Sequence, residues 1–141
     1  MKNLRVYTIT AKLKKSKIHE LVKSLCNELN FSISNLEINI ISSQSILEIN
    51  KNYLNHNYST DIITFNYSND NELIDGEIFV SIDDALNNAK KFRVKLSDEL
   101  TRLVIHGILH LLGYDDFKYS DKKIMKRLEN KLLSKNNFIL L

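Results

Sequence analysis

The sequence predicts an α+β fold in which about five helices pack on a small mixed sheet of four strands. Three observations predict this class. Four short stretches alternate apolar and polar residues, and five longer stretches repeat apolar residues at helical spacing. The two kinds follow one another as strand, helix, strand, helix, two strands and three helices. The chain has 141 residues, of which 43% are hydrophobic and 26% charged, so we expect one domain over residues 1–141.

In the first half of the chain, two strands alternate with two helices. Residues 4–10 and 36–41 alternate in polarity and are rich in β-branched side chains, so both stretches predict strands. Between them lies a basic turn over residues 12–17, followed by residues 18–29 with apolar side chains at helical spacing. Ser43 is a suitable N-cap for a second helix.

The second half begins with two strands and ends with three helices. Residues 62–67 and 77–82 predict the strands. Asp75-Gly76, a dipeptide typical of tight turns, is expected to close the polar loop between them. The three helices that follow are expected to begin at short polar side chains that can cap them, namely Asp83 or Asp84, Ser97 and Ser120.

The composition restricts the classes of function. A net charge of +3 permits an RNA partner without requiring one. The single cysteine, Cys26, excludes an internal disulfide and is expected to be a small core residue. No apolar run is long enough to cross a bilayer, and the first residues do not resemble a signal peptide. We therefore expect a cytoplasmic protein with no membrane partner.

The most informative stretch holds two histidines within an apolar, helix-like run. His106 and His110 are four residues apart, so a helix places both imidazoles on one face. Gly113 follows at the place where a helix-ending residue with positive φ belongs. The chain can then return Asp115 or Asp116 to the two rings. Two imidazoles and one carboxylate would leave a fourth position open, which is the arrangement of a catalytic metal site.

This pattern also has an ordinary explanation, because a pair of histidines with this spacing often has no metal. Gly107 favours the functional interpretation: glycine inside a helix costs about 1 kcal/mol relative to alanine, so a close approach to the backbone is expected there. A divalent ion held by His106, His110 and Asp116 would acidify a bound water and polarise a phosphoryl or carbonyl oxygen. Hydrolysis is the reaction that these properties favour.

The histidine spacing is similar to that of the metzincin protease signature, with two departures. Gly107 replaces the glutamate that serves those proteases as general base, and Asp116 replaces their third histidine. Peptide hydrolysis by that mechanism is therefore not expected. Cleavage of RNA depends less on such a base, because the 2′-OH supplies an internal nucleophile and metal charge can stabilise the transition state.

Three blocks of the sequence together resemble the YbeY family of bacterial rRNA-maturation endoribonucleases. His-Gly-Ile-Leu-His-Leu-Leu-Gly-Tyr-Asp at 106–115 resembles the family signature H-G-x-L-H-L-x-G-Y-D. Residues 60–65 resemble its T-D-V-L-S-F strand, and residues 76–81 resemble its G-D-I-x-I-S strand. The resemblance is strong over residues 45–117, and the remaining elements fit in order and length.

The resemblance implies a function and a set of site residues. Carried over by position, the metal ligands and catalytic residues are His106, His110 and, in place of the third histidine, Asp116. It implies one zinc ion per chain, cleavage of single-stranded RNA, maturation of the 16S rRNA 3′ end and ribosome quality control. The implied partners are ribosomal RNA and small-subunit proteins or assembly factors, with no small-molecule cofactor. Two histidines and one carboxylate also suit iron, so the metal stays open.

Two departures from the family bear on catalysis. Aspartate at position 116 lowers the formal charge of a loaded site from +2 to +1, so we expect a less acidic bound water and a weaker attraction for phosphate. Leu54 stands where the family has an arginine thought to hold phosphate, and His56 is the nearest candidate to replace it. The lysines of 12–17 and of the last helix could also follow an RNA backbone.

Two alternative functions stay open on the sequence alone. One is a metzincin-like metallohydrolase, against which the missing glutamate argues. The other is a ribosome-assembly module that binds RNA or protein and whose zinc is mainly structural. The role of Asp115 is also open, because it can orient a histidine N–H beside the metal or simply stabilise the turn.

Overall fold

Four strands form one mixed sheet with the spatial order β1-β2-β4-β3. The strands are β1 (Leu4–Thr8), β2 (Ser32–Ile41), β3 (Ile62–Asn66) and β4 (Leu73–Ser81). β1, β2 and β4 run parallel to one another, and β3 is antiparallel to β4. The structure is a computed structural model, and it describes residues 1–136 and 139–141. The small mixed sheet that the sequence predicts is confirmed.

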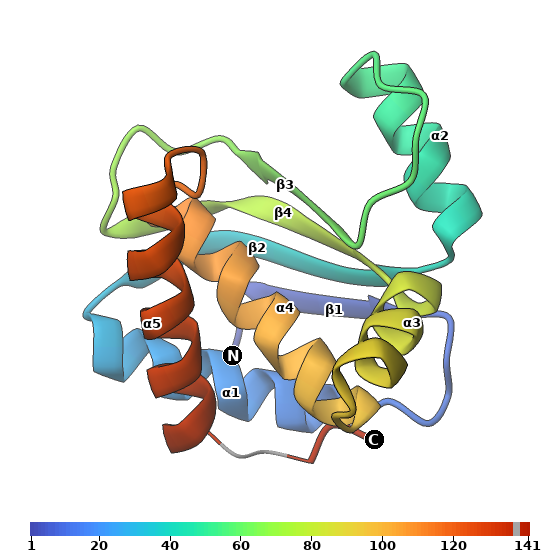
Figure 1. Cartoon of the computed structure of the whole chain (residues 1–141). Coiled ribbons are helices and arrows are strands. Elements are labelled where there is room, and N and C mark those ends of the chain that lie inside the picture. The colour runs from blue at the N-terminus through green and yellow to red at the C-terminus, as the bar shows by residue number, and fades with distance from the viewer. Residues whose placement is uncertain (137–138) are drawn as a thin grey trace.

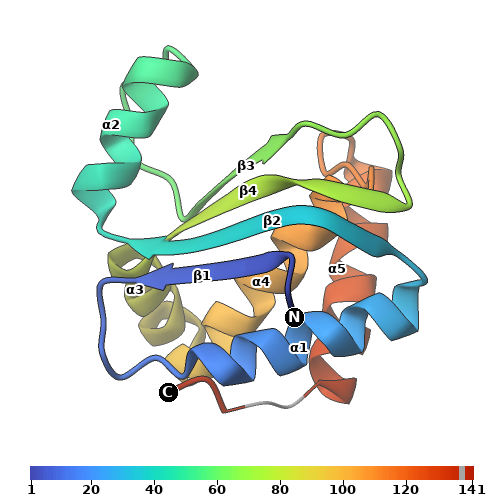
Figure 2. The same ribbon diagram turned by 180° about the vertical axis from the view of Figure 1, so that it is seen from behind.

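Five helices accompany the sheet in the part of the chain that the structure describes. They are α1 (Lys15–Leu29), α2 (Ser43–Tyr53), α3 (Ile82–Phe92), α4 (Leu96–Leu111) and α5 (Tyr119–Lys135). Figure 1 shows α4 crossing one face of the sheet between α3 and α5, with α1 below strand β1. Seen from behind in Figure 2, the strands lie in front of these helices, and α2 stands away from them. The predicted α+β class, with about five helices, is confirmed.

One hydrophobic core lies between the sheet and the helices. Val6, Ile38 and Ile78 occupy the same row of three neighbouring strands, and all three are buried. Their row faces α4, in which most side chains are buried, including Leu103 and Ile108. A helix that is apolar on most sides must lie at the centre of its domain. The packing therefore fixes the position of α4 and of every side chain that it presents.

The turn expected at Asp75-Gly76 is wrong, because both residues lie inside β4. The chain reverses earlier, where Asp70 accepts the backbone N–H of Leu73 at 3.2 Å. Gly76 is required for close packing: a Cβ there would lie 2.5 Å from the carbonyl oxygen of Phe65. A glycine that permits a close approach within a sheet has the same local signature as a glycine in a turn.

The helix starts also differ from the expected ones. Ser42 caps α2 and Ser81 caps α3, each by accepting an N–H three residues further on. α4 and α5 begin after lysines without any side-chain cap. Neighbouring short polar residues compete for a cap, and tertiary contacts choose among them. The expected caps that the structure does not use in this way are Ser43, Asp83, Asp84, Ser97 and Ser120.

Membrane-spanning helices are not found in the described part of the chain. None of the helices within residues 1–136 and 139–141 combines the length and the apolar character that crossing a bilayer requires.

Candidate metal centre

Helix α4 holds His106 and His110 on one face, one turn apart, as their spacing predicts. Their ring centroids are 4.6 Å apart and their planes meet at 75°. The two Nε2 atoms are separated by 3.0 Å, so both point at the same small volume. The side chains are 15% and 25% exposed, which places them at the edge of the core with access to solvent.

Gly107 lies between the histidines, where α4 approaches the sheet most closely. A Cβ at this position would lie 2.9 Å from Cδ1 of Ile78 and 3.1 Å from Cδ1 of Ile62. The missing side chain therefore lets the helix lie close to β3 and β4. The close approach that the sequence predicts at this glycine is confirmed.

The turn after α4 brings the carboxylate to the rings. Gly113 has a φ of 98°, the left-handed conformation expected for a helix-ending glycine. The Oδ2 atom of Asp116 lies 3.5 Å from Nε2 of His106, and its Oδ1 atom lies 3.6 Å from Nε2 of His110. Asp115 instead accepts the backbone N–H of Asp116 at 2.7 Å. Of its two possible roles, the structure therefore supports the role in the turn.

These separations fit a single divalent ion. Ligand atoms about 2.1 Å from a tetrahedral zinc ion lie about 3.4 Å from one another, and the separations found here run from 3.0 to 3.6 Å. Within residues 1–136 and 139–141, His106, His110 and Asp116 form the only group of three such residues whose ligand atoms lie within 4.8 Å of one another. Two imidazoles and one carboxylate suit both zinc and iron.

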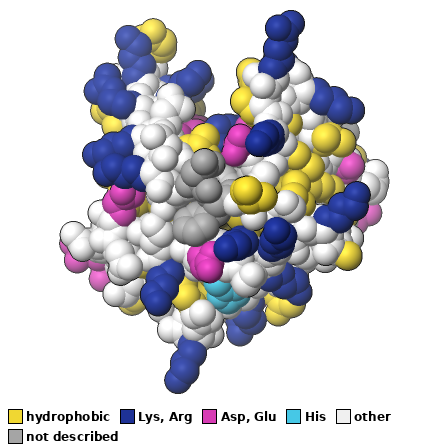
Figure 3. Space-filling view, turned by 90° about the horizontal axis from the view of Figure 1, so that it is seen from below, with side chains coloured by type: hydrophobic (Ala, Val, Ile, Leu, Met, Phe, Trp, Pro, Cys, Tyr) yellow, Lys and Arg dark blue, Asp and Glu magenta, His cyan; other side chains and the backbone are white. Residues whose placement is uncertain are grey.

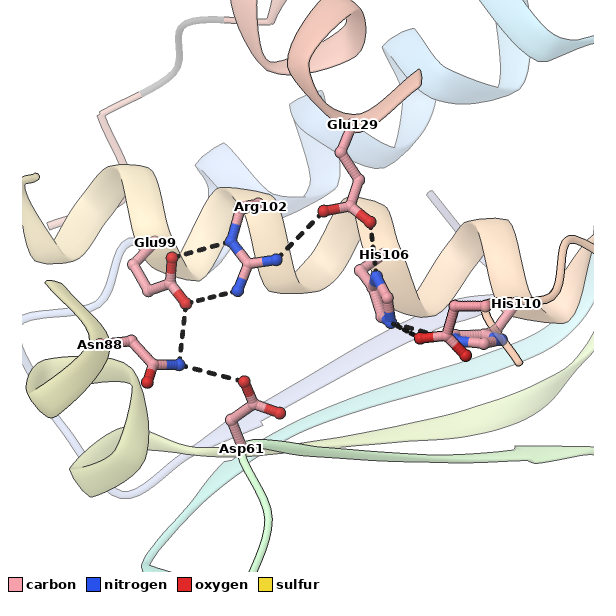
Figure 4. A network of polar contacts seen from close by, with 8 residues as sticks. Asp61, Asn88, Glu99, Arg102, His106, His110 and Glu129 are labelled. Carbon is pink, nitrogen blue, oxygen red and sulfur yellow. Dashed lines mark hydrogen bonds and ion pairs between the residues drawn. The ribbon is translucent and has the colours of Figure 1, made fainter. Parts of the chain in front are cut away.

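A polar network extends behind His106, and sequence reasoning missed it (Figure 4). The Oε2 atom of Glu129 lies 2.6 Å from Nδ1 of His106, and Oε1 accepts a hydrogen bond of 3.1 Å from Arg102. Glu129 comes from α5 and is 5% exposed. One signal was available: Glu129 lies four residues after Met125 and three before Leu132, on the apolar stripe of the helix.

Arg102 is held between two carboxylates. Its Nε and Nη2 atoms donate to the two oxygens of Glu99 at 2.9 and 2.7 Å. The hydrogen bonds that Arg102 donates to Glu99, together with the negative charges of both glutamates, raise the pKa of Arg102 further above its ordinary value despite burial. Asn88 extends the network by donating to Glu99 and to Asp61.

A groove between α4 and α5 leads away from the candidate metal centre. Its volume is about 420 Å³, and it includes His106 and Asp116 at one end. Apolar side chains such as Met125 form much of its wall, and Lys122 and Lys126 contribute positive charge beside carboxylates that include Asp98 and Asp116. Long cationic side chains beside a water-accessible metal centre suit a ligand that carries phosphate groups.

The candidate replacement for the family arginine is not supported by the structure. His56 stacks on Tyr58 with ring centroids 5.1 Å apart, and its Nδ1 atom lies 3.0 Å from the tyrosine hydroxyl. It does not line the groove between α4 and α5. Leu54 is the C-cap that follows α2, and it is exposed. The lysines of the groove are therefore better candidates for contacting phosphate.

Basic side chains also occur away from the candidate centre. Figure 3 shows lysine and arginine side chains around the underside of the molecule, with acidic and apolar groups between them. They do not gather into one continuous basic stripe on this face. A general attraction for polyanions follows from such a surface, but a defined binding track does not.

Fold and site together define an α+β protein with a candidate divalent-metal centre on a central helix and the turn that follows it. Comparison with known proteins gives the particular family. The model of the family described as "Endoribonuclease YbeY" matches residues 3–137. The chain belongs to the endoribonuclease YbeY family.

Curated relatives agree with this assignment. A protein of Bacteroides thetaiotaomicron named Endoribonuclease YbeY is 38% identical over 122 residues, which cover 86% of this chain and 88% of the relative. One of the same name from Karelsulcia muelleri is 47% identical over 96 residues, or 67% of each chain. The solution structure of a Thermotoga maritima protein has a TM-score of 0.68 and 25% identity, covering 94% of this chain and 88% of the other.

Proposed function

We propose that this chain is a metal-dependent endoribonuclease that hydrolyses phosphodiester bonds in single-stranded ribosomal RNA. The observation that carries the proposal is the convergence of His106, His110 and Asp116 within 3.6 Å, beside a solvent-accessible groove. Curated relatives in the same family are named endoribonucleases. We further propose maturation of the 16S rRNA 3′ end and ribosome quality control as the biological roles.

His106, His110 and Asp116 are proposed as both the metal ligands and the catalytic residues. A divalent ion supplies Lewis-acid charge to a phosphodiester when it is bound there. We propose one zinc ion per chain, with iron as the alternative that the same ligands would accept. The two half-buried rings approach from α4, whereas the more exposed aspartate approaches from the turn. The side away from the helix therefore stays open to substrate.

Gly107 is consistent with RNA rather than peptide as substrate. It occupies the position at which the similar protease signature has a glutamate base. An RNA strand brings its own nucleophile, the 2′-OH, so the chain must mainly orient the phosphate and stabilise its charge. Lys122 and Lys126 can contact neighbouring phosphates from α5.

Exposed aromatic side chains near the centre support a single-stranded substrate. Phe117 and Tyr119 are 87% and 74% exposed; Phe117 follows Asp116 in the turn, and Tyr119 begins α5. Bases of a single strand stack on such rings without regard to sequence, whereas bases inside a duplex are not available for stacking. We therefore propose that the strand leaves the candidate centre over this turn.

The extent of the domain, the partners and the cellular location complete the proposal. We propose that residues 1–141 act as one endoribonuclease domain, which is supported by a single hydrophobic core and by the family match over residues 3–137. Ribosomal RNA is the proposed substrate, and small-subunit proteins or assembly factors are the proposed partners. A cytoplasmic location accords with that substrate.

The proposal predicts that His110→Ala abolishes RNA cleavage, with a loss of about 100-fold or more, while the fold is retained because this side chain is partly exposed. The assay uses a single-stranded fragment that spans the 16S rRNA 3′ end, with a duplex of the same sequence as control. A chelator should stop wild-type cleavage, and added zinc should restore it. Equal cleavage by the folded variant, or cleavage that resists the chelator, would contradict the proposal.

A further inference from the structure

Glu129 connects His106 to a buried ion pair. One of its carboxylate oxygens lies 2.6 Å from Nδ1 of His106, and the other accepts a hydrogen bond of 3.1 Å from Arg102 (Figure 4). The glutamate is 5% exposed and comes from α5, whereas the other two residues come from α4. The contact therefore joins two helices directly behind the candidate metal centre.

The chemistry of the contact determines which nitrogen of His106 holds the proton. An ionised carboxylate can only accept hydrogen bonds, so Nδ1 of the imidazole must be the donor. In the neutral ring, Nε2 then keeps its lone pair, and Nε2 is the atom that faces His110 and Asp116. We infer that Glu129 is a positioning residue that holds His106 in the metal-binding tautomer. This inference rests on the proposed metal site.

Arg102 and Glu99 make that role possible. Arg102 offers only donors, so it fixes one oxygen of Glu129 and leaves the other directed at the imidazole. Glu99 in turn grips the guanidinium with two hydrogen bonds of 2.9 and 2.7 Å. Two carboxylates share one guanidinium, so the three side chains carry one net negative charge next to the centre. That charge favours a bound cation.

Glu129→Gln tests the tautomer directly. The amide oxygen of the glutamine must face Arg102, because that residue has no acceptor. The amide NH₂ then faces Nδ1 of His106 and donates to it, which favours the ring proton on Nε2 and weakens metal binding. We expect zinc affinity to fall about 10- to 100-fold. The measurement is competition for Zn²⁺ against a chromophoric chelator.

Glu99→Gln is the matched control. It removes the same formal charge from the same guanidinium, but Glu99 makes no hydrogen bond to His106. We expect a clearly smaller loss of zinc affinity than in Glu129→Gln, because the charge is lost but the carboxylate that accepts the proton of His106 is kept. An equal loss in both variants would assign the effect to charge alone and overturn the inference, as would unchanged affinity in Glu129→Gln. Thermal unfolding of the metal-free variants verifies that each one folds.

A second measurement needs no folded variant of Glu129. Long-range ¹H–¹⁵N correlation spectra of the wild-type, metal-free protein distinguish the two neutral histidine tautomers. We expect the proton of His106 on Nδ1, and a proton on Nε2 would overturn the inference. Both tests use metal binding and ring protonation. A wild-type protein that binds zinc and carries the proton of His106 on Nδ1, but does not cleave RNA, would contradict the proposed function and leave this inference intact.

Discussion

Asp116 is the residue that distinguishes this centre from one with three histidines. Its two oxygens lie 3.5 and 3.6 Å from the Nε2 atoms of His106 and His110, within the range that a shared ion requires. A carboxylate ligand contributes a negative charge that a neutral imidazole lacks. The charge that a loaded site presents to an incoming phosphate is therefore reduced.

Asp116→His is predicted to change the pH dependence of cleavage. Removal of the carboxylate charge raises the net positive charge of the loaded site, which favours ionisation of a bound water. We expect the activity of the variant to begin at lower pH than that of the wild-type protein. The measurement is the rate of cleavage against pH at saturating zinc.

Asp115→Asn is a suitable control for this comparison. It removes an equal charge from the neighbouring residue, and asparagine can still accept the N–H of Asp116 in the turn. A profile that Asp116→His leaves unchanged, or that both variants shift equally, would refute the effect of the ligand charge.

Local spacing was sufficient to predict that three side chains converge, but not the network behind them. His106, His110 and Asp116 lie on one helix and its following turn, where geometry is set by residues close in sequence. Glu129 and Glu99 reach the site only because α5 packs beside α4 and both carboxylates meet Arg102. Such tertiary contacts have no fixed sequence spacing. A carboxylate on an apolar helix stripe was the only local indication.

At the scale of elements, the position of α4 depends on how closely it approaches the sheet. Gly107 lies against Ile78 and Ile62, whose Cδ1 atoms would be 2.9 and 3.1 Å from an added Cβ. The histidines on either side of this glycine are therefore placed by the contact between helix and sheet. A change in that contact alters stability without touching a ligand.

Gly107→Ala is predicted to lower the free energy of unfolding by about 1 kcal/mol. Alanine gains about 1 kcal/mol in helix propensity, but overpacking a core costs about 1–3 kcal/mol. Ile78→Val removes one of the crowded methyl groups, so Gly107→Ala should cost about 1 kcal/mol less in that background. Urea unfolding of both single variants and of the double variant measures this coupling, and equal costs in both backgrounds would contradict it.

Element boundaries were harder to predict than elements. The alternation and helical periodicities predicted, in the correct order, the nine helices and strands of residues 1–136 and 139–141. Asp75-Gly76 misled because a glycine needed beside the backbone of Phe65 has the local signature of a turn. Ser43 was expected as a cap, but Ser42 accepts the first-turn N–H. Tertiary contacts decide both cases, and they are not encoded in neighbouring residues.

At the scale of the whole molecule, the arrangement of layers follows from the order of the elements. Three parallel strands and one antiparallel edge strand leave a single face on which α4 is buried (Figure 1). The sequence predicts this class, because the elements and their apolar faces are local properties. The groove of about 420 Å³ between α4 and α5 could not be predicted, since it depends on how two helices pack.

The central claim is that two rings of α4 and one carboxylate of the following turn bind the same ion. A crystal of the wild-type protein soaked in zinc, with diffraction recorded at the zinc absorption edge, tests it most directly. The account predicts one anomalous peak about 2.0–2.2 Å from Nε2 of His106, Nε2 of His110 and a carboxylate oxygen of Asp116. If zinc binds elsewhere in the crystal but gives no peak at this position, the account is contradicted. A peak that lacks one of these three ligands would contradict it as well.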